Sequence, residues 1–224
     1  MSLRTFLASH PALLKLWNRG MDLFASIHWP RFQAILNGGL YYSLIEEDHD
    51  KIRDILKKNY LIILTRRKCH LTTYLIALIA YLKTHQKSYY CHALMNVEGD
   101  ITNNMDYKLI EATQQGVHFS TFMQVFDCDS VVLLKPKDVP LEEWTAVLDA
   151  VKLELGEPYD TLFDITNNKA VSCVEMVYQG LQKLPDYANR FPDLTKLIEE
   201  AGNDLTPQML YVCRDLEVVF EARR

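Results

Sequence analysis

Apolar residues recur along the chain with two different periods, one typical of helices and the other typical of strands. Helices are predicted over 10–27, 46–58, 71–84, 141–155, 173–184 and 194–201, with a turn at 28–30, a short helix to 36 and a break at 37–39. Runs rich in β-branched and aromatic residues predict strands near 60–65, 88–97, 107–112, 129–134 and 216–221. The segment 117–125 fits either an edge strand or a short helix. This pattern predicts an α+β fold in which a small antiparallel sheet packs against helices.

The first 58 residues are predicted to form a helical N-terminal extension, and residues 59–224 a single domain. The helix over 10–27 carries an apolar stripe that includes Leu13, Trp17 and Phe24. We expect this stripe to pack against the domain or against a second copy of the chain, as in a homodimer. Docking on a membrane surface and covering of the active site are the less favoured alternatives.

The segment Ala170-Val-Ser-Cys-Val-Glu-Met-Val177 contains a helix start with a cysteine at its first position. Ser172 and Glu175 fit the capping box, in which the serine accepts from the third helical amide and the glutamate bonds back to the cap. Cys173 then lies at the positive end of the helix, where unpaired amides favour the nucleophilic thiolate. The alternative is a small buried hydrophobic residue, which is the commonest fate of a free cysteine.

His92 is the candidate base for this cysteine. It lies in the predicted strand 88–97, which turns at Glu98-Gly-Asp100 and is followed by the strand 107–112. If these strands form a hairpin centred on residues 101 and 102, facing residues have numbers that sum to about 203, and His92 faces Glu111. A carboxylate at this place fixes the imidazole tautomer and stabilises the imidazolium, as the third member of a catalytic triad does.

The order of these pieces resembles the permuted papain-like amidases, the YiiX-like branch of the NlpC-type cysteine hydrolases, in which His precedes Cys along the chain. The pieces are Leu61-Ile-Ile-Leu64, Cys91-His-Ala-Leu94, Ile110-Glu-Ala112, Val131-Val-Leu-Leu-Lys-Pro136, Gly156-Glu-Pro-Tyr-Asp160, Val171-Ser-Cys-Val-Glu175 and Leu205-Thr-Pro207. Together they cover residues 60–220. Each piece alone occurs by chance, so the resemblance rests on their joint order and spacing.

This resemblance implies Cys173 as the nucleophile, His92 as the general base, Glu111 as the group that orients it, and Tyr159 beside the nucleophile. Two departures concern the substrate pocket. The family often has Ser or Thr directly before the His and a glycine shortly after it, whereas this chain has Cys91 and then Ala-Leu-Met. The first strand of the family usually ends in a turn with Gly or Asp, but here it continues into Arg66-Arg-Lys68.

Composition agrees with an intracellular globular enzyme of 224 residues. The net charge of -5 and the pI near 5.8 supply no basic footprint, so we do not expect nucleic-acid binding. Five cysteines with no C-x-x-C favour a reducing compartment over a disulfide framework. The start of the sequence lacks a signal-peptide pattern, and no apolar run approaches the ~20 residues that span a bilayer. The expected location is cytoplasmic.

The dipeptides Cys69-His70 and Cys91-His92 raise the question of a zinc site. Neighbouring side chains on a strand point to opposite faces, so Cys91 and His92 cannot both bind one ion without distortion. We expect no metal and no cofactor, with burial as the role of Cys69 and Cys91.

The sequence therefore predicts a cysteine amidase or peptidase that forms an acyl-enzyme. The resemblance suggests a peptide or acyl-amide substrate, such as a cell-wall peptide or a lipid-linked acyl group. An acyltransferase and a non-catalytic binding module on the same fold are the alternatives.

Overall fold

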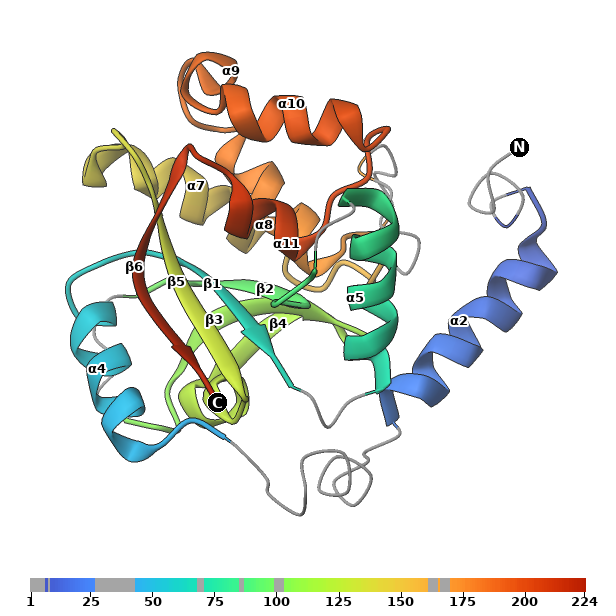
Figure 1. Cartoon of the computed structure of the whole chain (residues 1–224), viewed down its shortest axis with the longest axis horizontal. Helices are drawn as coiled ribbons and strands as arrows, with labels where there is room; N and C mark the ends of the chain where they lie inside the picture. The colour runs from blue at the N-terminus through green and yellow to red at the C-terminus, as the bar shows by residue number, and fades with distance from the viewer. Residues whose placement is uncertain are drawn as a thin grey trace.

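The computed structural model describes residues 7, 9–26, 43–67, 71–84, 87–98, 103–160, 165 and 170–224 (Figure 1). Helix α2 (Pro11–Ser26) corresponds to the helix predicted over 10–27. The turn, short helix and break predicted between residues 28 and 39 lie outside the described residues.

In the part of the chain that the structure describes, six strands form one sheet in the order β4-β3-β2-β1-β5-β6, and every neighbouring pair is antiparallel. The strands are β1 (Ile62–Arg66), β2 (His92–Asn96), β3 (Tyr107–Thr113), β4 (Gly116–Thr121), β5 (Ser130–Pro136) and β6 (Leu216–Arg223). Helices pack on this sheet. The structure thus confirms the mixed α+β class with an antiparallel sheet.

Alternation along the central strands gives the sheet two apolar faces. Ile62 and Leu64 of β1 join the core beneath α7 (Leu141–Leu153), α8 (Cys173–Leu181), α10 (Pro192–Glu200) and α11 (Pro207–Val212). Leu61 and Ile63 join a second core with α4 (Glu46–Leu56) and α6 (Phe122–Phe126). Both sides of the chain are therefore buried from Leu61 to Leu64, which explains the continuous apolar run of these four residues.

The segment 117–125 was predicted as either an edge strand or a short helix, and it contains both. Residues up to Thr121 form the edge strand β4, and α6 begins immediately afterwards. Thr121 ends the strand because its hydroxyl accepts from the amide of Gln124 at 3.3 Å and so caps the helix. The short helices α9 (Tyr187–Arg190) and α11 were not predicted, since they are too short to show a helical period.

The helix α4 lies on the N-terminal side of the expected domain boundary at residue 58. Its Ile52 and Leu56 are fully buried in the second core, against the sheet. The boundary itself stays a prediction.

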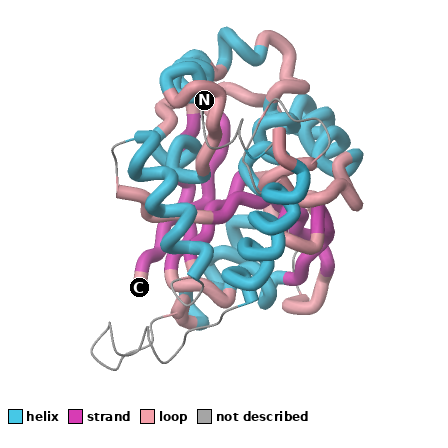
Figure 2. Tube along the Cα trace, turned by 90° about the vertical axis from the view of Figure 1, so that its right-hand side faces the viewer, coloured by secondary structure: helices cyan, strands magenta, loops and turns pink. Residues whose placement is uncertain are grey.

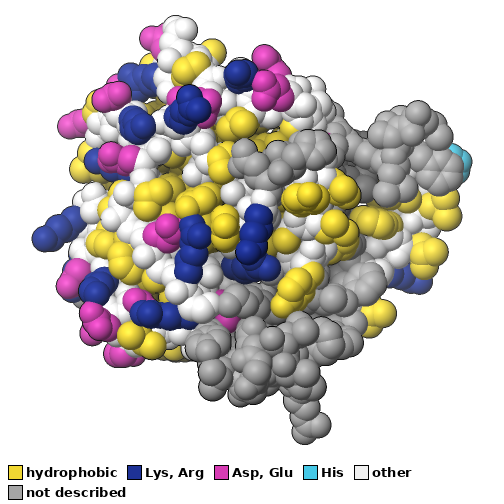
Figure 3. Space-filling view, in the orientation of Figure 1, with side chains coloured by type: hydrophobic (Ala, Val, Ile, Leu, Met, Phe, Trp, Pro, Cys, Tyr) yellow, Lys and Arg dark blue, Asp and Glu magenta, His cyan; other side chains and the backbone are white. Residues whose placement is uncertain are grey.

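The helix α2 contacts α5 (Leu71–Thr84), and Figure 2, viewed from the side where α2 lies, shows it in front of the strands. Leu16 of α2 is 67% exposed, and Leu78 and Leu82 of α5 are 53% and 62% exposed. Figure 3 shows hydrophobic side chains gathered on this side of the molecule. Among the described residues, no helix has both the length and the apolar character needed to cross a membrane.

Candidate active site

The helix α8 begins as the sequence predicts, with Cys173 at its first position. The Ser172 hydroxyl accepts from the amide of Glu175 at 3.4 Å, and the Glu175 carboxylate accepts from the amide of Ser172 at 2.6 Å. Val174 and Val177 are fully buried against the sheet. The capping box and the apolar face together fix the position of the cysteine, whose side chain is only 1% exposed.

His92 and Glu111 meet as predicted, but the predicted register is wrong by two residues. Leu94 is the residue that faces Glu111, so facing numbers sum to 205 instead of about 203. Because side chains alternate with a period of two, this shift leaves His92 and Glu111 on the same face as diagonal neighbours. Nε2 of His92 lies 2.6 Å from Oε2 of Glu111, within hydrogen-bonding distance.

The observed pairing places the centre of the hairpin one residue beyond the predicted one. A turn directly precedes β3: the amide of Asp106 donates to the Asn103 carbonyl at 3.1 Å, and the Asn103 side chain accepts from the amide of Met105 at 3.0 Å. Such side-chain to backbone bonds are typical of turns.

Two further residues contact Glu111 from the edge strand β4, and the sequence analysis missed both. Ser120 donates its hydroxyl to Oε1 of Glu111. His118 faces Glu111 across the β3–β4 ladder, and its Nε2 lies 3.8 Å from the same oxygen. The alternation of His118 and Ser120 along a strand was the available signal, but it needed the pairing of β3 with β4 to become informative.

The environment favours the charged forms of both partners. Burial alone lowers the pKa of His92, but its hydrogen bonds and charge interactions with Cys173 and Glu111 outweigh this and raise the pKa to about 10. Burial alone raises the pKa of Glu111, whereas the bonds from His92 and Ser120 lower it to about 2. The pair is therefore an imidazolium and a carboxylate at neutral pH.

Cys173 and Tyr159 complete the cluster. Cys173 is close enough to His92 and to Tyr159 for its thiol to raise the pKa of both side chains. Burial, followed by the neighbouring Cys173, raises the pKa of Tyr159 well above its ordinary value, so its phenol keeps its proton. The structure thus brings together all four residues that the sequence singled out.

Backbone contacts hold Tyr159 in this place. It forms an isolated parallel bridge with Val171, the residue before the Ser172 cap. On its other side, the carbonyl of Glu157 accepts from the amide of Val117 at 2.9 Å. The tyrosine is therefore tied both to the start of α8 and to β4.

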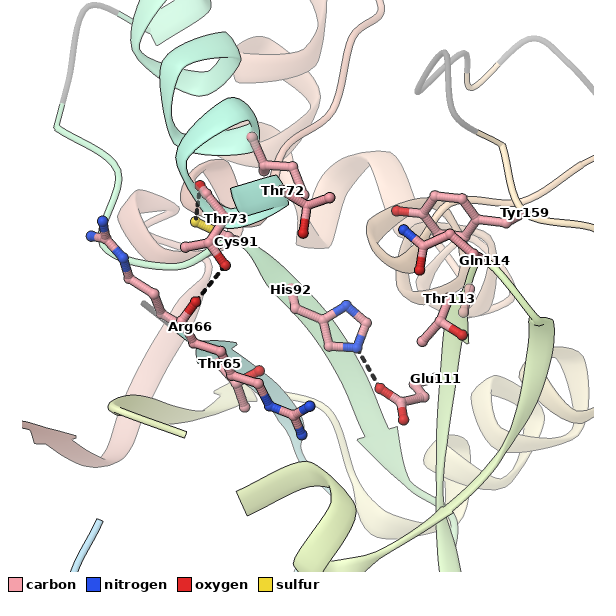
Figure 4. A pocket seen from close by; sticks show the side chains of 13 residues that line it. Thr65, Arg66, Thr72, Thr73, Cys91, His92, Glu111, Thr113, Gln114 and Tyr159 are labelled. Carbon is pink, nitrogen blue, oxygen red and sulfur yellow. Dashed lines mark hydrogen bonds and ion pairs between the residues drawn. The ribbon is translucent and has the colours of Figure 1, made fainter. Parts of the chain in front are cut away.

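A cavity of about 200 Å³ opens beside His92, Glu111 and Tyr159. Figure 4 shows the imidazole directed at Glu111, with Thr113, Gln114 and Tyr159 on one side and Thr72 on another. The described lining is Thr65, Arg66, Arg67, Thr72, Thr73, Ile76, Cys91, His92, Glu111, Ala112, Thr113, Gln114 and Tyr159. A small, polar substrate group fits such a site better than a large apolar one.

Cys91 is buried, as predicted, with 3% of its surface exposed. Its Sγ donates to the carbonyl of Thr73 at 3.2 Å, and burial raises its pKa to about 12, so it remains a neutral thiol. Cys69 and His70 lie outside the described residues. Within the described part of the chain, no three or more His, Cys, Asp or Glu side chains are grouped so as to hold a metal ion.

No family model matches the chain, and no curated protein matches it significantly. Among solved structures, the chain is similar to the crystal structure of the metalloprotein YiiX from Escherichia coli O157:H7, described as DUF1105. The match has a TM-score of 0.51 and 20% identity and covers 73% of this chain and 97% of YiiX. At this level of identity the likeness concerns the fold: this chain shares the mixed α+β architecture of YiiX.

Proposed function

We propose that this protein is a cysteine hydrolase of the permuted papain-like type, acting on an amide bond through an acyl-enzyme. The observation that carries this proposal is the 2.6 Å contact of His92 with Glu111. Cys173, at the first position of a capped helix, is near enough to His92 to raise the pKa of the imidazole. A nucleophile, a base and a group that orients the base are thereby assembled from three separate elements.

The bond between Glu111 and Nε2 of His92 assigns the two ring nitrogens their roles. With Nε2 engaged by the carboxylate, Nδ1 is the nitrogen available to exchange a proton with the thiol. The imidazolium and the first-turn amides of α8 stabilise negative charge on the sulfur. Glu111 keeps the ring oriented throughout, as its low pKa requires it to remain ionised.

In the proposed reaction, the Cys173 thiolate attacks the amide carbonyl, and the carbonyl electron pair moves onto oxygen. Amides of the first turn of α8 stabilise this oxyanion, with the protonated Tyr159 hydroxyl as a further donor. The carbon–nitrogen bond then breaks as His92 gives its proton to the leaving amine. Water, deprotonated by His92, finally cleaves the thioester and releases the acid together with the thiol.

The proposed substrates are peptides or acyl amides, such as a cell-wall peptide or a lipid-linked acyl group, and transfer to an acceptor other than water is a variant of the same chemistry. YiiX is described as a metalloprotein. The described residues of this chain offer no cluster suited to a metal, so the proposed mechanism includes none.

A second candidate function is a non-catalytic binding module that retains the fold. The observation in its favour is the burial of Cys173, which is 1% exposed although a nucleophile must meet its substrate. The two functions differ in the reactivity of this thiol, and a labelling experiment separates them.

The test compares alkylation of Cys173 by iodoacetamide in the wild type, His92→Ala and His118→Ala, with the labelled cysteine identified by peptide mass spectrometry. We expect labelling of the wild type to be at least about tenfold faster than that of His92→Ala, because the imidazolium is lost. His118→Ala is the matched control, since His118 contacts Glu111 but His92 keeps its own bond to it. Equal rates in all three folded proteins would overturn the hydrolase proposal.

A further inference from the structure

The basic run at the end of β1 departs from the turn expected there, and it lies at the candidate active site. Arg67 lines the cavity beside His92. It also lines a second cavity, of about 600 Å³, on the side of Glu111 where His118 and Ser120 lie. The Arg67 side chain thus stands at the boundary between two cavities that share Glu111.

The hydrogen-bonding capacity of Arg67 is mostly unused within the described structure. Its single bond runs from Nη2 to the carbonyl of Val125 at 3.4 Å, a long distance for a group with five N–H donors. No carboxylate of the described residues lies within ion-pair distance of it. Glu111 is near enough for Arg67 to lower its pKa, and its two oxygens already contact His92 and Ser120.

Arg66, the neighbouring cation, is engaged elsewhere. Its Nη1 donates to the carbonyl of Ser88 at 3.2 Å, and its guanidinium lies 5.9 Å from the ring centre of Tyr74. Figure 4 shows this side chain directed away from His92. Of the two arginines, Arg67 is the one that lines both cavities and lies close enough to Glu111 to lower the pKa of that carboxyl.

The rest of the lining also favours an anion. The cavity beside His92 has two arginines and a protonated imidazole against the single carboxylate of Glu111. Thr72, Thr113 and Gln114 add hydroxyl and amide donors around it. Thr72 and Thr73 belong to the first turn of α5, whose amides carry a partial positive charge.

We propose that Arg67 binds an oxyanionic group of the substrate, a carboxylate or a phosphate, that lies a few bonds from the carbonyl attacked by Cys173. This inference rests on the proposed function and names the substrate class of the same site. A guanidinium binds either oxyanion through two parallel hydrogen bonds, which also fixes the orientation of the substrate.

The test uses three alkylating probes that differ in charge: iodoacetyl-glycine with a carboxylate, iodoacetyl-aminomethylphosphonate with a phosphonate, and neutral iodoacetyl-glycinamide. The measured quantity is the rate of Cys173 labelling by each anionic probe divided by the rate for the neutral probe. In Arg67→Gln we expect this ratio to fall about tenfold relative to the wild type, the loss typical of one charged hydrogen-bonding partner. The carboxylate and phosphonate arms show which oxyanion the site prefers.

Arg214→Gln is the matched control, because it removes the same charge from an exposed side chain that lines neither cavity and should leave the ratio within about twofold of the wild type. Arg67→Lys keeps the charge without the planar fork and should give an intermediate ratio. A ratio unchanged by Arg67→Gln, or lowered equally by Arg214→Gln, would overturn the inference. If the neutral probe still requires His92 in that case, the hydrolase proposal stands and only the anion site fails.

Discussion

His92 and Glu111 are joined by a bond of 2.6 Å although they do not face each other across the β2–β3 ladder. They are diagonal neighbours, and the glutamate side chain is long enough to bridge the offset. The carboxylate also receives the Ser120 hydroxyl, so it is held from both sides. The His92–Glu111 pair therefore belongs to the candidate active site and also contributes measurably to the stability of the fold.

Replacing Glu111 by glutamine should lower the free energy of unfolding by an amount that depends on pH. The raised pKa of His92, about 10, gives stabilisation that is complete below its ordinary value of about 6.5 and is lost as pH rises to about 10. The lowered pKa of Glu111, about 2, gives stabilisation present above about 4.5 and lost as pH falls toward 2. We expect Glu111→Gln to lower the free energy of unfolding by about 2 kcal/mol between about pH 4.5 and pH 6.5, and by less on either side.

Urea unfolding of wild type and Glu111→Gln across this pH range measures the effect. A difference that stays constant from acid to alkaline pH would contradict the assigned charges.

Ser120→Ala should remove one hydrogen bond to Glu111 and leave the bond between His92 and Glu111 in place. Loss of the hydroxyl donor should raise the pKa of Glu111, lower the pKa of His92 and cost about 1 kcal/mol of stability. NMR titration of the His92 imidazole measures the shift directly. Ser88→Ala is the control, since it also removes a buried hydroxyl, one that donates to the carbonyl of Tyr90 instead. The same His92 titration in both variants would show that Ser120 does not act through Glu111.

Ser172→Ala tests the cap that places Cys173. The lost side-chain acceptor should destabilise the protein by about 1 kcal/mol and loosen the first turn of α8, which should slow labelling of Cys173. Thr121→Ala removes the equivalent cap of α6, at the end of β4, and should reduce stability by a similar amount while leaving the labelling rate unchanged. Chemical unfolding and iodoacetamide labelling give the two readouts. Equal slowing of labelling in both variants would attribute the effect to general destabilisation.

Gly116→Ala should disturb the contact that holds the Tyr159 segment. Gly116 has a φ of +88°, and a Cβ there would lie 2.5 Å from the carbonyl oxygen of Glu157. Gly156 has nearly the same φ, +89°, but no atom within 4 Å of the position of a Cβ. Both alanine variants pay the strain of positive φ, on the order of 1 kcal/mol, and only Gly116→Ala adds a backbone clash. We therefore expect a larger loss of thermal stability for Gly116→Ala. Equal losses would mean that the backbone around Glu157 moves easily enough to relieve the clash.

The sequence by itself determined what depends on neighbouring residues. The capping box at Ser172 and Glu175 is a local hydrogen-bonding pattern, so it placed Cys173 correctly at the start of α8. Alternation in β2 and β3 is equally local, and it put His92 and Glu111 on one face even though the register was two residues off. An error of a single residue would have put them on opposite faces.

Only the tertiary structure decided which distant groups meet these residues. Ser120 contacts Glu111 because β4 pairs with β3, and Arg67 borders the same carboxylate from the end of β1. The true register of β2 and β3 is likewise seen only in the pairing of the two strands. Such contacts arise from the pairing and packing of whole elements, and the period of any single segment carries no information about which elements become neighbours.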